Sequence, residues 1–102
     1  MTEDETKECS VEIEMGLIAG RHFLKNWQGP LRHDLTRDHF ENWADSAERA
    51  VVKLDKSWTE KIQHERSRVM VGGLDSPGHF IPGVHNIMRL LEEARAALAH
   101  HG

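Results

Sequence analysis

Residues 36–70, TRDHFENWADSAERAVVKLDKSWTEKIQHERSRVM, carry the pattern that decides the fold. Apolar residues recur there every eleven positions, and the clearest series is Phe40, Val51 and Ile62. Eleven residues make three turns of an α-helix, at about 3.67 residues per turn, so this face stays apolar without a left-handed supercoil. The stretch therefore predicts one long helix with a continuous apolar stripe.

Such a helix is too long for the rest of the chain to cover. It would span roughly 50 Å at 1.5 Å per residue, whereas the flanking segments predict much shorter helices. An uncovered stripe of this length would be a large exposed apolar patch, which favours a partner chain. We therefore expect a homodimer that assembles through the long helix. The residues expected at this interface are Phe40, Trp43, Val51, Leu54, Trp58 and Ile62.

The sequence marks the start of the long helix clearly, but one competing signal inside the stretch favours two helices instead of one. Thr36 fits the N-cap position, and Gly72-Gly73 predicts the end of the helix. Residues 57–60, Ser-Trp-Thr-Glu, match a capping box, which would start a new helix after a break near Lys56. Because the apolar phase runs through this point unshifted, we expect one helix rather than two.

Two shorter helices flank the long one. Ser10 is a suitable N-cap for the first helix, which Gly29-Pro30 ends. Residues 74–83 contain two prolines and predict a loop, and residues 84–100 predict a third helix. The expected fold is all-α, with three helices (short, long and medium) that assemble through the middle helix into a dimeric helical bundle.

Length and charge limit the domain count and the partners. With 102 residues, the chain forms one domain at most, which we place at residues 10–102. Residues 1–14 carry six acidic side chains against one basic, a balance of −5, so we expect residues 1–9 to be a disordered acidic N-terminus. The other 88 residues carry 12 basic and 11 acidic side chains, a balance of +1. This near-neutral body predicts no nucleic-acid partner.

Cys9 is the single cysteine, so no disulfide can form within the chain, which predicts a reducing compartment. We expect a free thiol near a frayed terminus, with an intersubunit disulfide or a metal ligand as the alternative. No signal peptide is visible, and no apolar segment approaches the ~20 residues that cross a bilayer. The expected location is cytoplasmic, without a membrane partner.

Eight histidines are the one compositional hint of chemistry, since histidine is the commonest metal ligand. No two of them are three or four residues apart, so no helix face offers a ready pair of ligands. The candidate metal ligands are His79 and His85, which flank the stiff segment Phe80-Ile81-Pro82. The metal would be Zn²⁺ or Ni²⁺, with further ligands from Asp75, water or a second chain.

Two short motifs resemble known families. His22-Phe23-Leu24-Lys25-Asn26 resembles the phospho-acceptor box of sensor kinases and the His-x-Leu-Lys-Gly core of histidine-phosphotransfer domains. This resemblance implies that His22 is the phospho-acceptor, with a neighbouring cation to steady the phosphoryl group. Asn26 stands where the phosphotransfer core has glycine. Trp27-Gln28-Gly29 is similar to the Trp-x-Gly turn of small secreted helical-hairpin proteins, which dimerise.

No arrangement of residues in the sequence predicts a catalytic site, and the most informative residues belong to the apolar stripe. We therefore expect a small non-enzymatic accessory or adaptor protein that acts as a homo-oligomer through contacts with an unidentified protein. The alternatives are a metal-binding accessory protein or small enzyme subunit with histidines at a subunit interface, a histidine-phosphotransfer protein, and a secreted helical hairpin.

Overall fold

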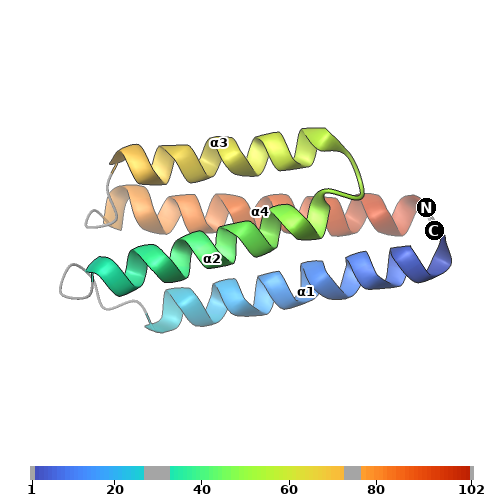
Figure 1. Ribbon diagram of the computed structural model, residues 1–102, viewed down its shortest axis with the longest axis horizontal. Coiled ribbons are helices and arrows are strands. Elements are labelled where there is room, and N and C mark those ends of the chain that lie inside the picture. Colours follow the sequence, from blue (N-terminus) through green and yellow to red (C-terminus); the bar gives the residue numbers. More distant parts are fainter. Residues whose placement is uncertain (1, 27–32, 73–76, 102) are drawn as a thin grey trace.

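The computed structural model describes residues 2–26, 33–72 and 77–101 of the chain, and in these ranges it contains helices and no strand (Figure 1). The all-α prediction is confirmed. The predicted count of three helices is wrong, because the described residues form four. They are α1 (Glu3–Asn26), α2 (His33–Val51), α3 (Lys56–Gly72) and α4 (Pro77–His101).

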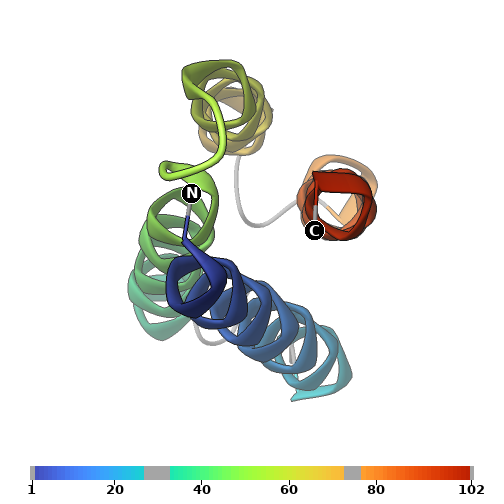
Figure 2. The ribbon, with the colours of Figure 1, turned by 90° about the vertical axis from the view of Figure 1, so that its right-hand side faces the viewer.

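The four helices form an antiparallel bundle in which each helix runs opposite to the one before it (Figure 1). Seen from the end, α1 lies beside α2 and α4, and α3 completes the ring on the opposite side (Figure 2). The bundle measures 45 × 22 × 17 Å. This up-down-up-down order is the one that short connections between consecutive helices favour.

The predicted long helix is broken at residues 52–55, so residues 36–70 form parts of two helices instead of one. Asp55 caps the second helix: its Oδ1 atom accepts a hydrogen bond from the Ser57 amide at 3.1 Å, and its carbonyl accepts one from the Trp58 amide at 3.1 Å. The competing signal placed the break correctly near Lys56, although the cap is Asp55 and not Ser57. After the reversal, the two halves of the stripe face a shared core.

The helix ends also differ from the prediction. α1 begins at Glu3, so the expected start at Ser10 is wrong, and residues 3–9 are helical rather than an unstructured head. The Thr2 hydroxyl oxygen accepts a hydrogen bond from the Glu5 amide at 3.2 Å, which forms an N-cap, and the acidic first turn suits the positive end of the helix dipole. α2 begins at His33, three residues before the expected cap.

α4 begins at Pro77, which makes residues 77–83 helical where a loop is expected. Proline is favoured in the first turn of a helix because its missing N–H would have no partner there. Gly83 lets α4 approach α3 closely, since a Cβ atom at this position would lie 2.0 Å from Cγ2 of Val69. No larger residue fits at Gly83 unless Val69 moves.

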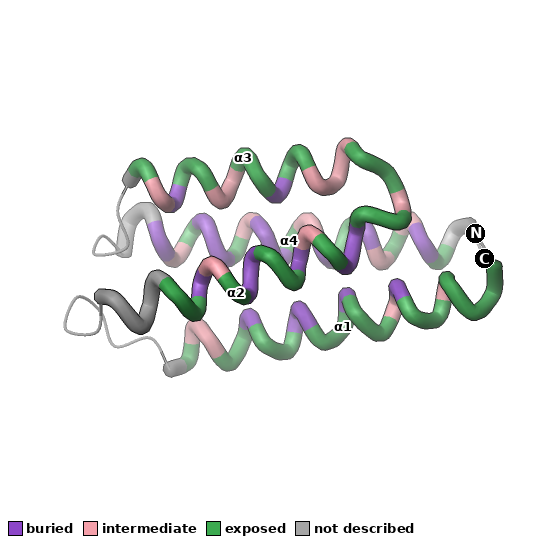
Figure 3. Tube along the Cα trace, viewed as in Figure 1, coloured by how far each residue is buried: buried purple, intermediate pink, exposed green. Residues whose placement is uncertain are grey.

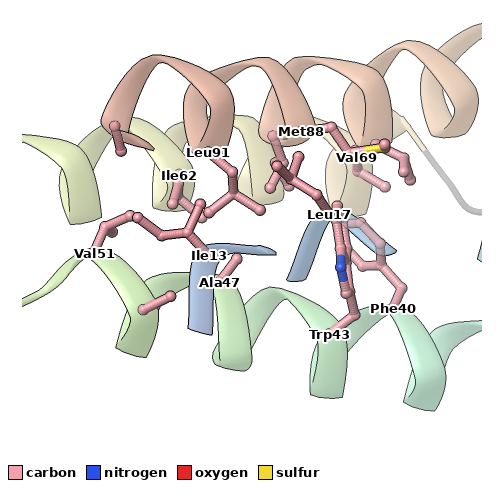
Figure 4. Close-up of a cluster of buried hydrophobic side chains, with 14 of the residues drawn as sticks. Ile13, Leu17, Phe40, Trp43, Ala47, Val51, Ile62, Val69, Met88 and Leu91 are labelled. Carbon is pink, nitrogen blue, oxygen red and sulfur yellow. The ribbon is translucent and has the colours of Figure 1, made fainter. Parts of the chain in front are cut away.

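The core runs along the axis of the bundle and takes side chains from all four helices (Figure 4). Ile13 and Leu17 of α1, Ile62 of α3 and Leu91 of α4 are fully buried. Each buried side chain of this size contributes about 1.5–3 kcal/mol to the free energy of unfolding. Among the described residues, the other large fully buried ones are Phe40, Phe80, Ile87, Val51, Val69, Val84 and Cys9.

The cap at Asp55 gives a first test of the fold. Asp55→Ala removes the acceptor for the Ser57 amide, and we expect it to lower the free energy of unfolding by about 1 kcal/mol in urea denaturation. Asp55→Asn keeps an acceptor at the same position and should stay near the wild-type value. Equal stability of the alanine and asparagine variants would contradict the role of this cap.

Candidate protein-contact surface

The six residues expected at a dimer interface lie in or against the core of their own chain. Phe40, Val51 and Ile62 are fully buried, and Trp43 is 6% exposed. Leu54 and Trp58 are half-buried and pack against the same core. The long apolar stripe is therefore covered by helices of the same chain, so its length no longer calls for a partner.

Aromatic side chains join α1, α2 and α4 at one end of the bundle. The Phe23 ring lies 5.4 Å from Phe80 and 6.5 Å from Trp43, and Phe40 lies 5.9 Å from Phe80, measured between ring centroids. The Trp43 indole N–H donates a hydrogen bond to the Gly16 carbonyl of α1 at 2.8 Å. Trp43 thus serves to hold α1 against α2.

Cys9 is fully buried and donates its S–H to the Ala50 carbonyl, with 3.0 Å between Sγ and the oxygen. Burial raises the pKa of the thiol, and the carboxylate of Glu12 adds to this effect, while Lys53 lowers the pKa in part. The thiol is therefore a neutral packing group that links α1 to the end of α2. A disulfide between chains or a metal bond at this position would require the helices to separate.

This burial predicts slow reaction of Cys9 with a chromogenic aromatic disulfide at pH 8. The thiolate is the reacting form, and both its low population and its lack of access slow the reaction. We expect the native rate to be at least about tenfold below that in denaturant, because reaction waits for local opening. The variant Ser67→Cys adds an exposed thiol on α3 and should show one fast and one slow phase. Two fast phases would contradict the buried position of Cys9.

Ion pairs fix the helices to one another at the surface. Arg66 of α3 reaches Asp45 at 2.6 Å and Glu48 at 2.7 Å, both on α2. Burial tends to lower the pKa of Arg66, but its hydrogen bonds with the two carboxylates raise it overall. Arg95 of α4 pairs with Glu14 of α1 in the same way. These pairs stabilise the arrangement of the helices and leave no unmatched charge at Arg66.

The histidines that the structure describes do not form a metal centre. In this part of the chain, no three histidine, cysteine, aspartate or glutamate side chains lie close enough together to hold a metal ion. His85 is exposed on α4, and the side chain of His79 lies outside the described residues, as does Asp75. The predicted Zn²⁺ or Ni²⁺ site therefore stays a prediction.

His22 is exposed near the end of α1, and a shallow hollow beside it is lined by Ile18, Arg21 and Lys25. Two cationic side chains thus lie within a turn of the imidazole. The structure places the candidate phospho-acceptor where a small anion has access to it. The Trp27-Gln28-Gly29 turn lies outside the described residues.

The outer face of α1 carries a row of apolar side chains that none of the four described helices covers. Val11, Met15 and Ile18 are 57%, 64% and 45% exposed. Their spacing of four and three residues places them on one face of the helix, directly away from the core. The exposed edge of α1 runs along the outside of the bundle (Figure 3). We call Val11, Met15 and Ile18 the α1 row.

A groove between α1 and α2 continues this apolar surface. Met15 belongs to both the row and the groove, and Trp43 forms part of the groove floor. The groove is lined by Glu12, Met15, Gly16, Ala19, Asn42, Trp43, Ser46 and Arg49. The remaining strongly exposed apolar residues of the described chain, Val52 and Val71, lie elsewhere and singly. The row and the groove adjoin each other at Met15 and together form an apolar surface over α1 and α2.

The sequence-based prediction missed the α1 row because it followed only the core-facing side of this helix. The row is visible in the sequence as apolar residues at positions 11, 15 and 18, which alternate with the core residues Ile13 and Leu17. A helix with apolar residues on two opposite faces is the signal, because one bundle can bury only one of them.

Comparison with known proteins gives no match to a family model, to a curated protein or to a solved structure. Among the helices of the described residues, none has a stretch long and apolar enough to span a bilayer.

Proposed function

We propose that this chain is a small non-enzymatic accessory or adaptor protein that acts as a homo-oligomer through protein–protein contacts. The observation that carries the proposal is the α1 row, Val11, Met15 and Ile18, which stays exposed on a bundle whose core is otherwise closed. Single exposed apolar residues are ordinary, but three on one helix face beside an apolar groove favour a contact surface.

The distribution of polar groups supports a surface function over a reacting site. Arg66 and Arg95 are engaged in ion pairs between helices, and Lys53, in the turn between α2 and α3, pairs with Glu8 of α1. The polar hollow between α3 and α4 is partly filled by contacts such as the hydrogen bond from Asn86 to Glu65 at 3.1 Å. These groups stabilise the bundle, whereas the α1 row contributes nothing to its core.

The substitution Met15→Asp tests this function. Met15 is 64% exposed, so an aspartate there should leave the free energy of unfolding within about 0.5 kcal/mol of the wild type. In an oligomer it would bury a charge, and we expect the dissociation constant to rise at least about tenfold. Light scattering coupled to size-exclusion chromatography measures the mass over a concentration series.

Val71→Asp is the matched control, because Val71 is 89% exposed on α3 and lies outside the row. It should leave the mass of the wild-type assembly unchanged. A wild-type mass of 11.7 kDa at every concentration would contradict the homo-oligomer. An assembly that Met15→Asp leaves intact would contradict the assignment of the contacts to the α1 row.

A second candidate function is phosphoryl acceptance at His22. The observation that favours it is the exposed imidazole beside Arg21 and Lys25, which together line one hollow. Cations one turn apart on a helix attract a phosphoryl group and offset its negative charge. In this reaction, a bond forms between an imidazole nitrogen and phosphorus, and the bond from phosphorus to its donor group breaks.

Phosphoramidate, a small phosphoryl donor that releases ammonia on transfer, tests this candidate. We expect one acid-labile phosphoryl group on the chain by intact-mass spectrometry, lost in His22→Gln and retained in His85→Gln. His85 is the control because it is also exposed, on α4. Equal labelling of the two variants would contradict a special role for His22.

A further inference from the structure

The α1 row is the centre of a longer seam on the outer face of the helix. Positions 4, 8, 11, 15, 18, 22 and 25 are separated alternately by four and three residues, and all seven are exposed. This spacing is the 3.5-residue repeat with which two helices pack along their length. The seam covers 21 residue steps, roughly 32 Å at 1.5 Å per residue.

The charges at the two ends of this seam are opposite. Asp4 and Glu8 lie before the apolar centre, and Lys25 lies after it together with His22, which is counted as neutral. The whole helix shows the same division: residues 3–14 carry six acidic side chains and one lysine, a balance of −5. Residues 15–26 carry two basic side chains and no acidic one, a balance of +2.

We infer that α1 pairs with α1 of a second copy of this chain, antiparallel, about a two-fold axis beside Met15. In this register position 4 meets position 25 of the partner, 8 meets 22, and 11 meets 18. Asp4 then faces the partner's Lys25, and Glu8 faces the partner's His22. Val11 packs against the partner's Ile18. In this register the apolar centre of one seam faces the apolar centre of the other, and each acidic end faces the partner's basic end.

Charge complementarity selects a second copy in this direction. A parallel pair would place the acidic half of α1 against its own equivalent, and like charges at close spacing destabilise a helix pair. Glu8 already contacts Lys53 of its own chain at 3.4 Å, but its side chain remains 67% exposed and accessible to the partner. An interface around a two-fold axis requires a self-complementary surface, which this seam provides.

This inference rests on the proposed function, because it names the partner that the α1 row contacts and the register of that contact. In this arrangement His22 lies opposite the partner's Glu8, so the dimer would restrict access to the imidazole. His22 therefore has a different role in each proposal: it faces the partner's Glu8 in the antiparallel pair, and it is the reacting group in the phosphoryl acceptor.

A charge-exchange experiment tests the register. One variant carries Asp4→Lys with Glu8→Lys, and the other carries His22→Glu with Lys25→Glu. Each variant alone brings like charges together in the antiparallel pair, and we expect its dissociation constant to rise at least about tenfold. In an equimolar mixture the lysines of one variant face the glutamates of the other. The mixture should recover the mass of two chains, as measured by light scattering.

The control is Glu92→Lys with Glu93→Lys on the exposed surface of α4, which makes the same change in net charge as Asp4→Lys with Glu8→Lys but outside the seam. It should assemble like the wild type, and circular dichroism checks that every variant is folded. Two results overturn the inference: variants that self-associate as the wild type does, or a mixture that stays monomeric. If either occurs while Met15→Asp still separates the chains, the proposed function stands and only the antiparallel register is wrong.

Discussion

Asp55 accepts hydrogen bonds from the backbone of α3 through both its side chain and its carbonyl, and this cap fixes the reversal between α2 and α3. The reversal brings Phe40 and Val51 on one side and Ile62 and Val69 on the other into one core. Without it, the apolar stripe of residues 36–70 would extend along one rod and find no cover within the chain. The bundle depends on a break that the hydrophobic period alone does not reveal.

The sequence predicts the all-α class and most of the core residues. It does not predict the number of helices. Periodicity identifies which residues are apolar on a common face, and Phe40, Val51 and Ile62 are indeed buried. It cannot distinguish a face buried by a second chain from one buried by a fold-back, because the pattern is the same in both cases. In the folded chain a turn at residues 52–55, capped by Asp55, produces the fold-back, and such caps are weak signals beside a continuous stripe.

The proposed contact surface was harder to predict than the core for a related reason. α1 carries two apolar faces, one with Ile13 and Leu17 and the other with Val11, Met15 and Ile18. Only the folded bundle shows which face is inside, since both have helical spacing. The five-residue motif at residues 22–26 indicated His22 as a candidate phospho-acceptor. The structure adds that His22 lines an exposed hollow together with Lys25, which the motif alone does not reveal.

Gly83 and Val69 illustrate how close packing couples two positions that are distant in the sequence. The space that a Cβ atom at position 83 would need is occupied by a methyl group of Val69. Because the two side chains compete for the same space, a larger side chain at one position requires a smaller side chain at the other. As such a protein diverges, residues 69 and 83 are therefore expected to change together, and the contact between α3 and α4 would be recorded as covariation between them.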